Sequence, residues 1–181
     1  MTDEYGTFEH ADHTGPRREH GYCTDDMARV LVVTSRQPAP GPPVKALARK
    51  ALRFVTEAQG PTGDCVSRRD CLGQWQGAYV VEDCWGRSLW GLGTAAARSP
   101  DDGVRQAALA HFERGAQKRS RWPRAMAFAT LGAHEVLVAC PQNRAALDLI
   151  AAAAEVLGHK VACASWPWPE PRLTYANAVL P

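Results

Sequence analysis

The stretch EDCWGRSLWGLGTAAA, residues 82–97, has the pattern of a helix that begins after an acidic pair. Trp85, Leu89, Trp90 and Leu92 give it an apolar face, and acidic residues favour the first turn of a helix. The wider composition agrees, because alanine is abundant and Ile150 is the only isoleucine. We therefore predict a helix over residues 83–97 in a largely helical protein.

A shorter version of this pattern occurs nearer to the N-terminus. Asp25, Arg29 and Leu31 have the same spacing as Asp83, Arg87 and Leu89, and 58 residues separate the two sets. Both sets lie where a helix is predicted to begin after a loop. Because 58 residues is about one helical hairpin with its loops, the repeat is typical of a solenoid or a toroid of hairpins.

Apolar periodicity predicts further helices around these two. They cover residues 25–36, 43–59, 99–117, 124–139 and 143–157, and residues 173–180 resemble the start of one more. Thr24 and Ser99 are the expected N-caps, and Gly158 is the expected stop of the last full helix. Residues 60–82 are rich in glycine and are expected to be irregular or to carry short strands.

These elements predict one all-α domain of about seven helices, made of αα-hairpins. The hairpins span residues 24–59, 83–117 and 123–157. An N-terminal loop spans residues 1–23, an irregular loop spans 60–82, and an aromatic loop with the start of a further helix spans 158–181.

The amino-acid composition indicates a folded domain and argues against several classes of protein. The chain has 181 residues, 45% apolar and 22% charged, which is enough for a single packed core and unlike a disordered chain. A formal net charge of +2 does not suit a protein that binds nucleic acid or an anionic membrane surface. The sequence has no run of about 18 apolar residues, and we do not expect its first residues to be a signal peptide, because they lack a basic region and an apolar core. We expect its six cysteines to be mostly free thiols in a reducing cytoplasm.

Two adjacent acidic pairs are the candidate catalytic groups. Asp25 and Asp26 open one predicted helix, and Glu82 and Asp83 open another. Their simplest role is to stabilise the helix dipole, with an Asp25–Arg29 ion pair one turn on. However, two adjacent carboxylates repel each other and raise the pKa of one of them, which is what a general acid needs.

Aromatic residues beside these carboxylates favour a sugar site, because rings stack on the C–H faces of sugars while charged groups bind hydroxyls. Besides Trp85 and Arg87, the stiff loop Trp166-Pro167-Trp168-Pro169-Glu170 presents two rings and a carboxylate. Phosphate-binding loops, dinucleotide-binding glycine motifs and serine-hydrolase elbows are missing from the sequence. A zinc site built from His10, His13, His20 and Cys23 is a further alternative, against which the ordinary interpretation is a polar surface loop.

Four segments together resemble a known family. They are residues 20–29 (HGYCTDDMAR), 82–93 (EDCWGRSLWGLG), 166–170 (WPWPE) and 173–177 (LTYAN). Their order is similar to that of the six-hairpin glycosidase-like domains of bacteria, which are often linked to glycosyltransferases. The resemblance extends from about Tyr5 to Pro181 and implies an all-α toroid, in which the beginnings of the inner helices line a carbohydrate cleft.

The chain departs from the family pattern in three respects. Met27 stands where an Asn usually follows the Asp-Asp pair, and Cys84-Trp85 replaces a Ser-His pair. A full (α/α)6 toroid has twelve helices, and this sequence predicts about seven. We therefore expect an incomplete toroid, either a fragment or half of an assembly, with an exposed apolar flank.

Two functions follow as hypotheses. The first is a glycoside-hydrolase-like enzyme without a cofactor, in which Asp26 and Asp83 form the acid/base pair and Asp25 and Glu82 are further candidates. The second is a non-catalytic glycan-binding or accessory domain, with a glycosyltransferase or a second copy of the chain as partner. In either case the predicted substrate-binding residues are Tyr22, Arg29, Trp85, Arg87, Trp166, Trp168 and Glu170.

Overall fold

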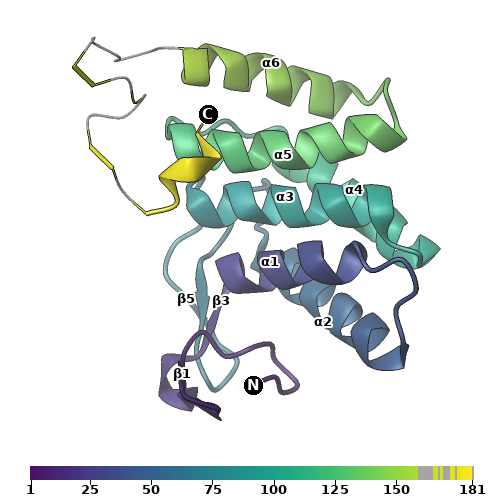
Figure 1. Ribbon diagram of the computed structural model, residues 1–181, viewed down its shortest axis with the longest axis vertical. Coiled ribbons are helices and arrows are strands. Elements are labelled where there is room, and N and C mark those ends of the chain that lie inside the picture. The colour runs from purple at the N-terminus through teal and green to yellow at the C-terminus, as the bar shows by residue number, and fades with distance from the viewer. Residues whose placement is uncertain (159–164, 167, 169–171, 174, 181) are drawn as a thin grey trace.

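The computed structural model describes residues 1–158, 165, 166, 168, 172, 173 and 175–180. Six α-helices in this part of the chain form three consecutive pairs (Figure 1). The pairs are α1 (Thr24–Ser35) with α2 (Pro42–Ala58), α3 (Asp83–Arg98) with α4 (Asp102–Gly115), and α5 (Pro123–Ala139) with α6 (Arg144–Gly158).

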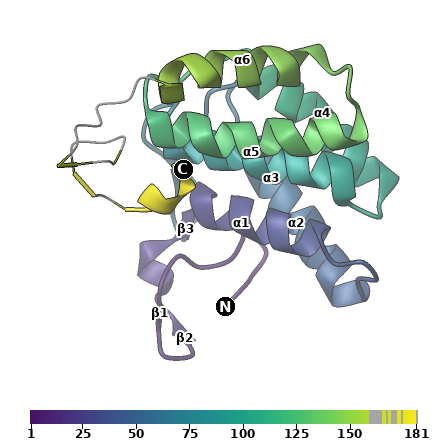
Figure 2. The same cartoon turned by 45° about the horizontal axis from the view of Figure 1, so that its top comes forward.

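The helices form two layers. Helices α1, α3 and α5 lie side by side with α3 in the middle, and each packs against the second helix of its own pair (Figures 1 and 2). Ion pairs between first turns, such as Arg87 with Asp25, show that the three helices of this inner layer begin at the same end. The prediction of a mostly helical protein built from hairpins is therefore confirmed at this level.

The all-α prediction is incomplete, because the loops form two small antiparallel sheets. One pairs β1 (Ala11–Asp12) with β2 (Gly15–Pro16), followed by the 3-10 turn η1 (Arg18–His20). The other joins β3 (Tyr22–Cys23), β4 (Arg68–Arg69) and β5 (Trp75–Gln76) in that order. The second sheet brings the loop between the first two hairpins against the beginning of α1.

Helix boundaries agree with the predicted ones to within a few residues, but both predicted caps are wrong. Thr24 is the first residue of α1, and its hydroxyl donates to the Val66 carbonyl at 2.8 Å. Asp101, and not Ser99, caps α4 by accepting from the backbone N–H groups of Gly103 and Val104. In the described part of residues 173–180, a 3-10 turn, η2 (Asn177–Val179), stands where the start of a further helix was predicted.

The middle helix, α3, is buried along most of its length, because α1, α4 and α5 all pack against it. Its glycines allow α5 to approach closely. A Cβ at Gly93 would lie 2.2 Å from the Gly132 carbonyl oxygen, and one at Gly132 would lie 2.1 Å from that of Leu89. The backbones of α3 and α5 are therefore in direct contact, which holds the inner layer together.

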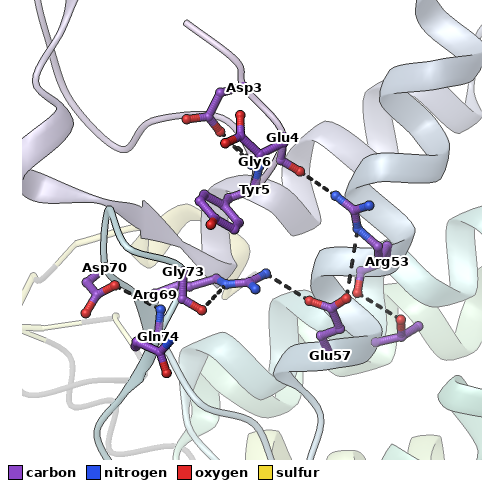
Figure 3. Close-up of polar contacts among 11 residues, drawn as sticks. Asp3, Glu4, Tyr5, Gly6, Arg53, Glu57, Arg69, Asp70, Gly73 and Gln74 are labelled. Carbon is purple, nitrogen blue, oxygen red and sulfur yellow. Dashed lines mark hydrogen bonds and ion pairs between the residues drawn. The ribbon is translucent and has the colours of Figure 1, made fainter.

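The N-terminal segment is held against α2 and the β4–β5 hairpin (Figure 3). Arg69 is the centre of this contact: it donates to the Gly73 carbonyl and to the Glu57 carboxylate, each at 2.8 Å. Its guanidinium group lies over the rings of Tyr5 and Trp75, each with a separation of 5.1 Å. Such cation–π contacts stabilise a partly buried arginine and tie the loops to the helices.

None of the helices in the described ranges has both the length and the apolar character needed to cross a membrane.

Candidate functional site

The candidate site lies where the three helices of the inner layer begin. Asp25 and Asp26 are in the first turn of α1, Asp83 is the first residue of α3, and Arg124 is the second residue of α5. Positive helix dipole ends converge here and favour the acidic side chains. The repeated Asp–Arg pattern of the sequence thus marks equivalent positions in two neighbouring helices.

Asp25 and Arg87 form a buried ion pair between α1 and α3. Arg87 Nε lies 3.0 Å from Asp25 Oδ2, and the arginine side chain is only 3% exposed. Arg87 Nη2 also lies 3.9 Å from Asp83 Oδ2, so one guanidinium group serves two carboxylates. Neither of these Arg87 nitrogens nor Asp25 Oδ1 has a hydrogen bond of good geometry within the described residues. Such orphaned polar atoms are costly when buried.

Burial raises the pKa of the Asp25 carboxyl above its usual range. Arg87 opposes this change, and the negative charges of Asp83 and Asp26 add to it. The direction agrees with the prediction for an adjacent acidic pair, but the largest cause is removal from water rather than the neighbouring carboxylate. Asp25 is therefore the carboxyl at this site that is shifted toward the protonated form.

Asp26 and Asp83 have their own arginine partners. Arg29 pairs with Asp26 one turn away, and not with Asp25 as predicted. Arg124 Nε donates to Asp83 Oδ2 at 2.7 Å. Three arginines thus hold the three aspartates of the site.

Two aromatic rings lie against the faces of the Arg87 guanidinium group. The Phe128 ring is 4.0 Å away and the Tyr175 ring 5.3 Å away. Trp90 stacks on Phe128 with ring centroids 5.8 Å apart. Together the rings shield the ion pair from water, which strengthens its electrostatic interactions.

Two aromatic residues predicted to bind substrate belong instead to the core. Trp85 is completely buried, and its indole N–H donates to the Gly115 carbonyl at 3.0 Å. Tyr22 is 1% exposed, and its hydroxyl donates to Asp3 at 2.6 Å. Neither ring is available to stack on a ligand, because helices and loops distant in sequence cover both of them.

The C-terminal candidates are only partly described. Trp166 and Trp168 are half-buried. Glu170 lies outside the described residues.

Two surface hollows flank the aspartates. The first, called the Trp122 hollow, has a volume of about 400 Å³ and is lined by Glu82, Asp83, Trp122, Pro123 and Arg124. Trp122 is 45% exposed, and the Arg121 guanidinium carbon lies 4.6 Å from the centre of its ring. The second hollow, of about 390 Å³, is lined by residues that include Asp26, Arg29, Val30 and Val33.

In the described residues, the side chains predicted as an alternative zinc site do not come together as a set of three ligands. His10 Nδ1 and His20 Nδ1 lie 3.1 Å apart, but the His13 side chain is almost fully exposed. Burial raises the pKa of the Cys23 thiol to about 11. No three His, Cys, Asp or Glu side chains in the described ranges are placed to hold a metal ion.

Sequence reasoning missed Arg124, Trp122, Phe128 and Tyr175 as members of the site. Arg124 and Trp122 had a usable signal, because they flank the proline at the predicted start of the third hairpin. Tyr175 lies in residues 173–177, a segment of the family resemblance, but is not among the predicted site residues. No signal in the sequence placed Phe128 over Arg87, because that contact depends on how α5 crosses α3.

Comparison with known proteins adds no further constraint, since no protein-family model and no curated protein matches this sequence.

Proposed function

We propose that this chain is a carbohydrate-binding domain of the incomplete α/α-toroid type and that the Trp122 hollow is its binding site. The observation that carries the proposal is the exposed Trp122 ring beside the carboxylates of Glu82 and Asp83 in one hollow. A ring of this kind stacks on the C–H face of a sugar, while the carboxylates and Arg124 bind its hydroxyls. A role as an accessory domain of a glycosyltransferase fits such a site.

Two features favour binding without turnover. Asp25, Asp26 and Asp83 are each paired with an arginine, so none is an unpartnered base. The residues that replace family residues, Met27, Cys84 and Trp85, are all buried in the core. None of these side chains replaces the polar groups that the family places there.

The test is a glycan screen followed by calorimetric titration of the best ligand with the full chain. We expect Trp122→Ala to weaken binding about tenfold or more, because the stacking surface is removed. Tyr79 is similarly exposed and lies outside the hollow, so Tyr79→Ala is the matched control and should bind as the unmodified chain does. The proposal is overturned if the unmodified chain binds no glycan, or if Trp122→Ala binds equally well.

A glycoside-hydrolase-like activity is the second candidate, and the raised pKa of Asp25 favours it. Asp25 and Asp83 both lie beside Arg87 and would be the two carboxyl groups that glycoside hydrolysis requires. In this case the bound glycan is hydrolysed, and Asp25→Asn and Asp83→Asn each abolish turnover while the glycan still binds. Intact glycan after long incubation at high protein concentration would exclude this activity.

A further inference from the structure

Tyr175 contacts all three arginines of the site, each through a different group. Its hydroxyl accepts from Arg29 Nη1 at 3.2 Å, and its carbonyl accepts from Arg124 Nη1 at 2.8 Å. Its ring lies 5.3 Å from the Arg87 guanidinium carbon. One residue from the C-terminal segment thus bridges arginines from α1, α3 and α5.

Each of these arginines pairs with an aspartate of the site, and Arg87 also lies near a second one, Asp83. Arg29 pairs with Asp26, Arg87 with Asp25, and Arg124 with Asp83, so the three aspartates share Tyr175 as a common second neighbour. A long arginine side chain loses rotamer freedom when it is fixed, and contacts on its far side reduce the number of orientations it can adopt. Tyr175 is therefore placed to set the orientation of all three carboxylates through their partners.

The segment that carries Tyr175 is docked on the helices. The turn η2 packs against α5, and Leu180 is only 2% exposed. Ala176, next to Tyr175, has a φ of 56°, in the left-handed region that non-glycine residues seldom adopt. Such a conformation persists only where surrounding contacts impose it, and the docked turn and the three arginine contacts supply them.

We infer that Tyr175 is a positioning residue of the carbohydrate site: it orients Arg29, Arg87 and Arg124, which in turn hold Asp26, Asp25 and Asp83. This inference rests on the proposed function for its ligand. Its structural content, the orientation of the arginines, is measurable without a ligand.

The experiment compares Tyr175→Phe and Tyr175→Leu in the full chain. Phenylalanine keeps the ring over Arg87 and loses the hydroxyl on Arg29, whereas leucine loses both. The backbone carbonyl contact to Arg124 is retained in both variants. The readouts are the ¹⁵N-resolved Nε–H signal of Arg87, which the Tyr175 ring shifts, and the dissociation constant for the glycan found in the screen.

We expect Tyr175→Leu to move the Arg87 signal and to weaken glycan binding about tenfold, because Arg87 also pairs with Asp83 of the Trp122 hollow. Tyr175→Phe, which keeps the ring, should restore most of both. Tyr79→Leu is the control and should change neither readout. An unchanged Arg87 signal in Tyr175→Leu overturns the inference whatever the glycan result. Tighter binding by Tyr175→Leu also overturns it, because Tyr175 would then be a lid over the site. A moved Arg87 signal in a chain that binds no glycan contradicts the proposed function and leaves the positioning role in place.

Discussion

Asp25 lies opposite Arg87 across the contact between α1 and α3, with its side chain 17% exposed. Burial and the Arg87 partner change the pKa of this carboxyl in opposite directions. Burial disfavours the charged form and Arg87 favours it, and the pKa is raised because burial has the larger effect. The sequence predicts only that Asp25 is an acidic residue in the first turn of a helix. The packing of α1 against α3 is what raises its pKa.

The raised pKa predicts how stability depends on pH. Below the unfolded-state value near 3.8, Asp25 is protonated in both the folded and the unfolded chain. Between that value and the higher folded-state value, the folded chain binds more protons. The stability contributed by the raised pKa is therefore fully present at low pH and is lost as pH rises through the folded-state value. Asp25→Asn removes this dependence, so the variant should gain stability relative to the unmodified chain as pH rises.

Urea unfolding of the two chains at about pH 4 and about pH 7 measures this difference, because the other titrating groups are common to both chains. Equal stability differences at the two pH values would show that the Asp25 pKa is not raised. Asp12→Asn, the same substitution at an exposed position, is the control for the loss of one carboxylate.

At the scale of single elements, the N-cap of α4 is Asp101, where the sequence predicted Ser99. Asp101 accepts two backbone N–H groups, whereas Ser99 accepts only that of Asp101. We expect Asp101→Ala to lower the thermal midpoint more than Ser99→Ala, because two orphan donors of the helix lose their acceptor. Calorimetry measures the thermal midpoints of both variants. A larger decrease in Ser99→Ala would show that Ser99, and not Asp101, caps the helix.

The crossing of α3 and α5 is the second prediction at this scale. A methyl group at Gly132 would meet the Leu89 carbonyl oxygen at 2.1 Å, which neither backbone avoids without moving. We expect Gly132→Ala to destabilise the fold by about 1–3 kcal/mol or more. At Gly158, the last residue of α6, an added methyl group would have no atom of the described residues within 4 Å, so we expect Gly158→Ala to change the stability by no more than about 0.5 kcal/mol. Chemical unfolding of both variants tests the contrast, and a neutral Gly132→Ala would mean that the helices are farther apart.

At the scale of the whole molecule, the far end of the inner layer is closed by one buried carboxylate. Glu135 of α5 accepts from Arg36, just after α1, and from Arg98, at the end of α3. The same three helices that share the Asp25, Asp83 and Arg124 cluster at one end are thus linked at the other end as well.

Removing the Glu135 carboxylate should lower the stability of the whole inner layer, because it contacts residues at the ends of all three helices. We expect Glu135→Ala to cost about 1–3 kcal/mol, less than the loss of a fully buried partner, because both arginines are about half exposed. The unfolding transition should stay cooperative, as measured by calorimetry together with circular dichroism. Glu113→Ala, at a carboxylate outside this cluster, is a control for the charge change. No loss of stability in Glu135→Ala would show that the link contributes nothing.

Local signals were sufficient to predict most of the helices. Pro123 begins α5, because a backbone without an N–H imposes its effect on the nearest residues alone. The same locality explains the failures at Thr24 and Ser99. Several residues near each helix start are able to cap it, and contacts with Val66 and Arg49 decide between them.

The candidate site, unlike the helices, depends mostly on contacts between distant segments of the chain. The sequence predicted the acidic residues at two helix beginnings, and both sets reach the same end of the inner layer. It did not predict that Arg87 pairs with Asp25, that Trp85 fills the core or that Tyr175 bridges three arginines. Each of these contacts joins segments far apart in the chain, so no spacing in the sequence encodes it.

The sequence by itself thus determined the helices, their pairing into hairpins and the acidic character of the helix beginnings. These depend on backbone geometry and on neighbours within a few residues. Only the tertiary structure decided which carboxyl is buried, which arginine it meets and which aromatic ring remains exposed. Burial and long-range electrostatics arise when distant segments pack together, and they change the pKa and accessibility of side chains whose local sequence is unchanged.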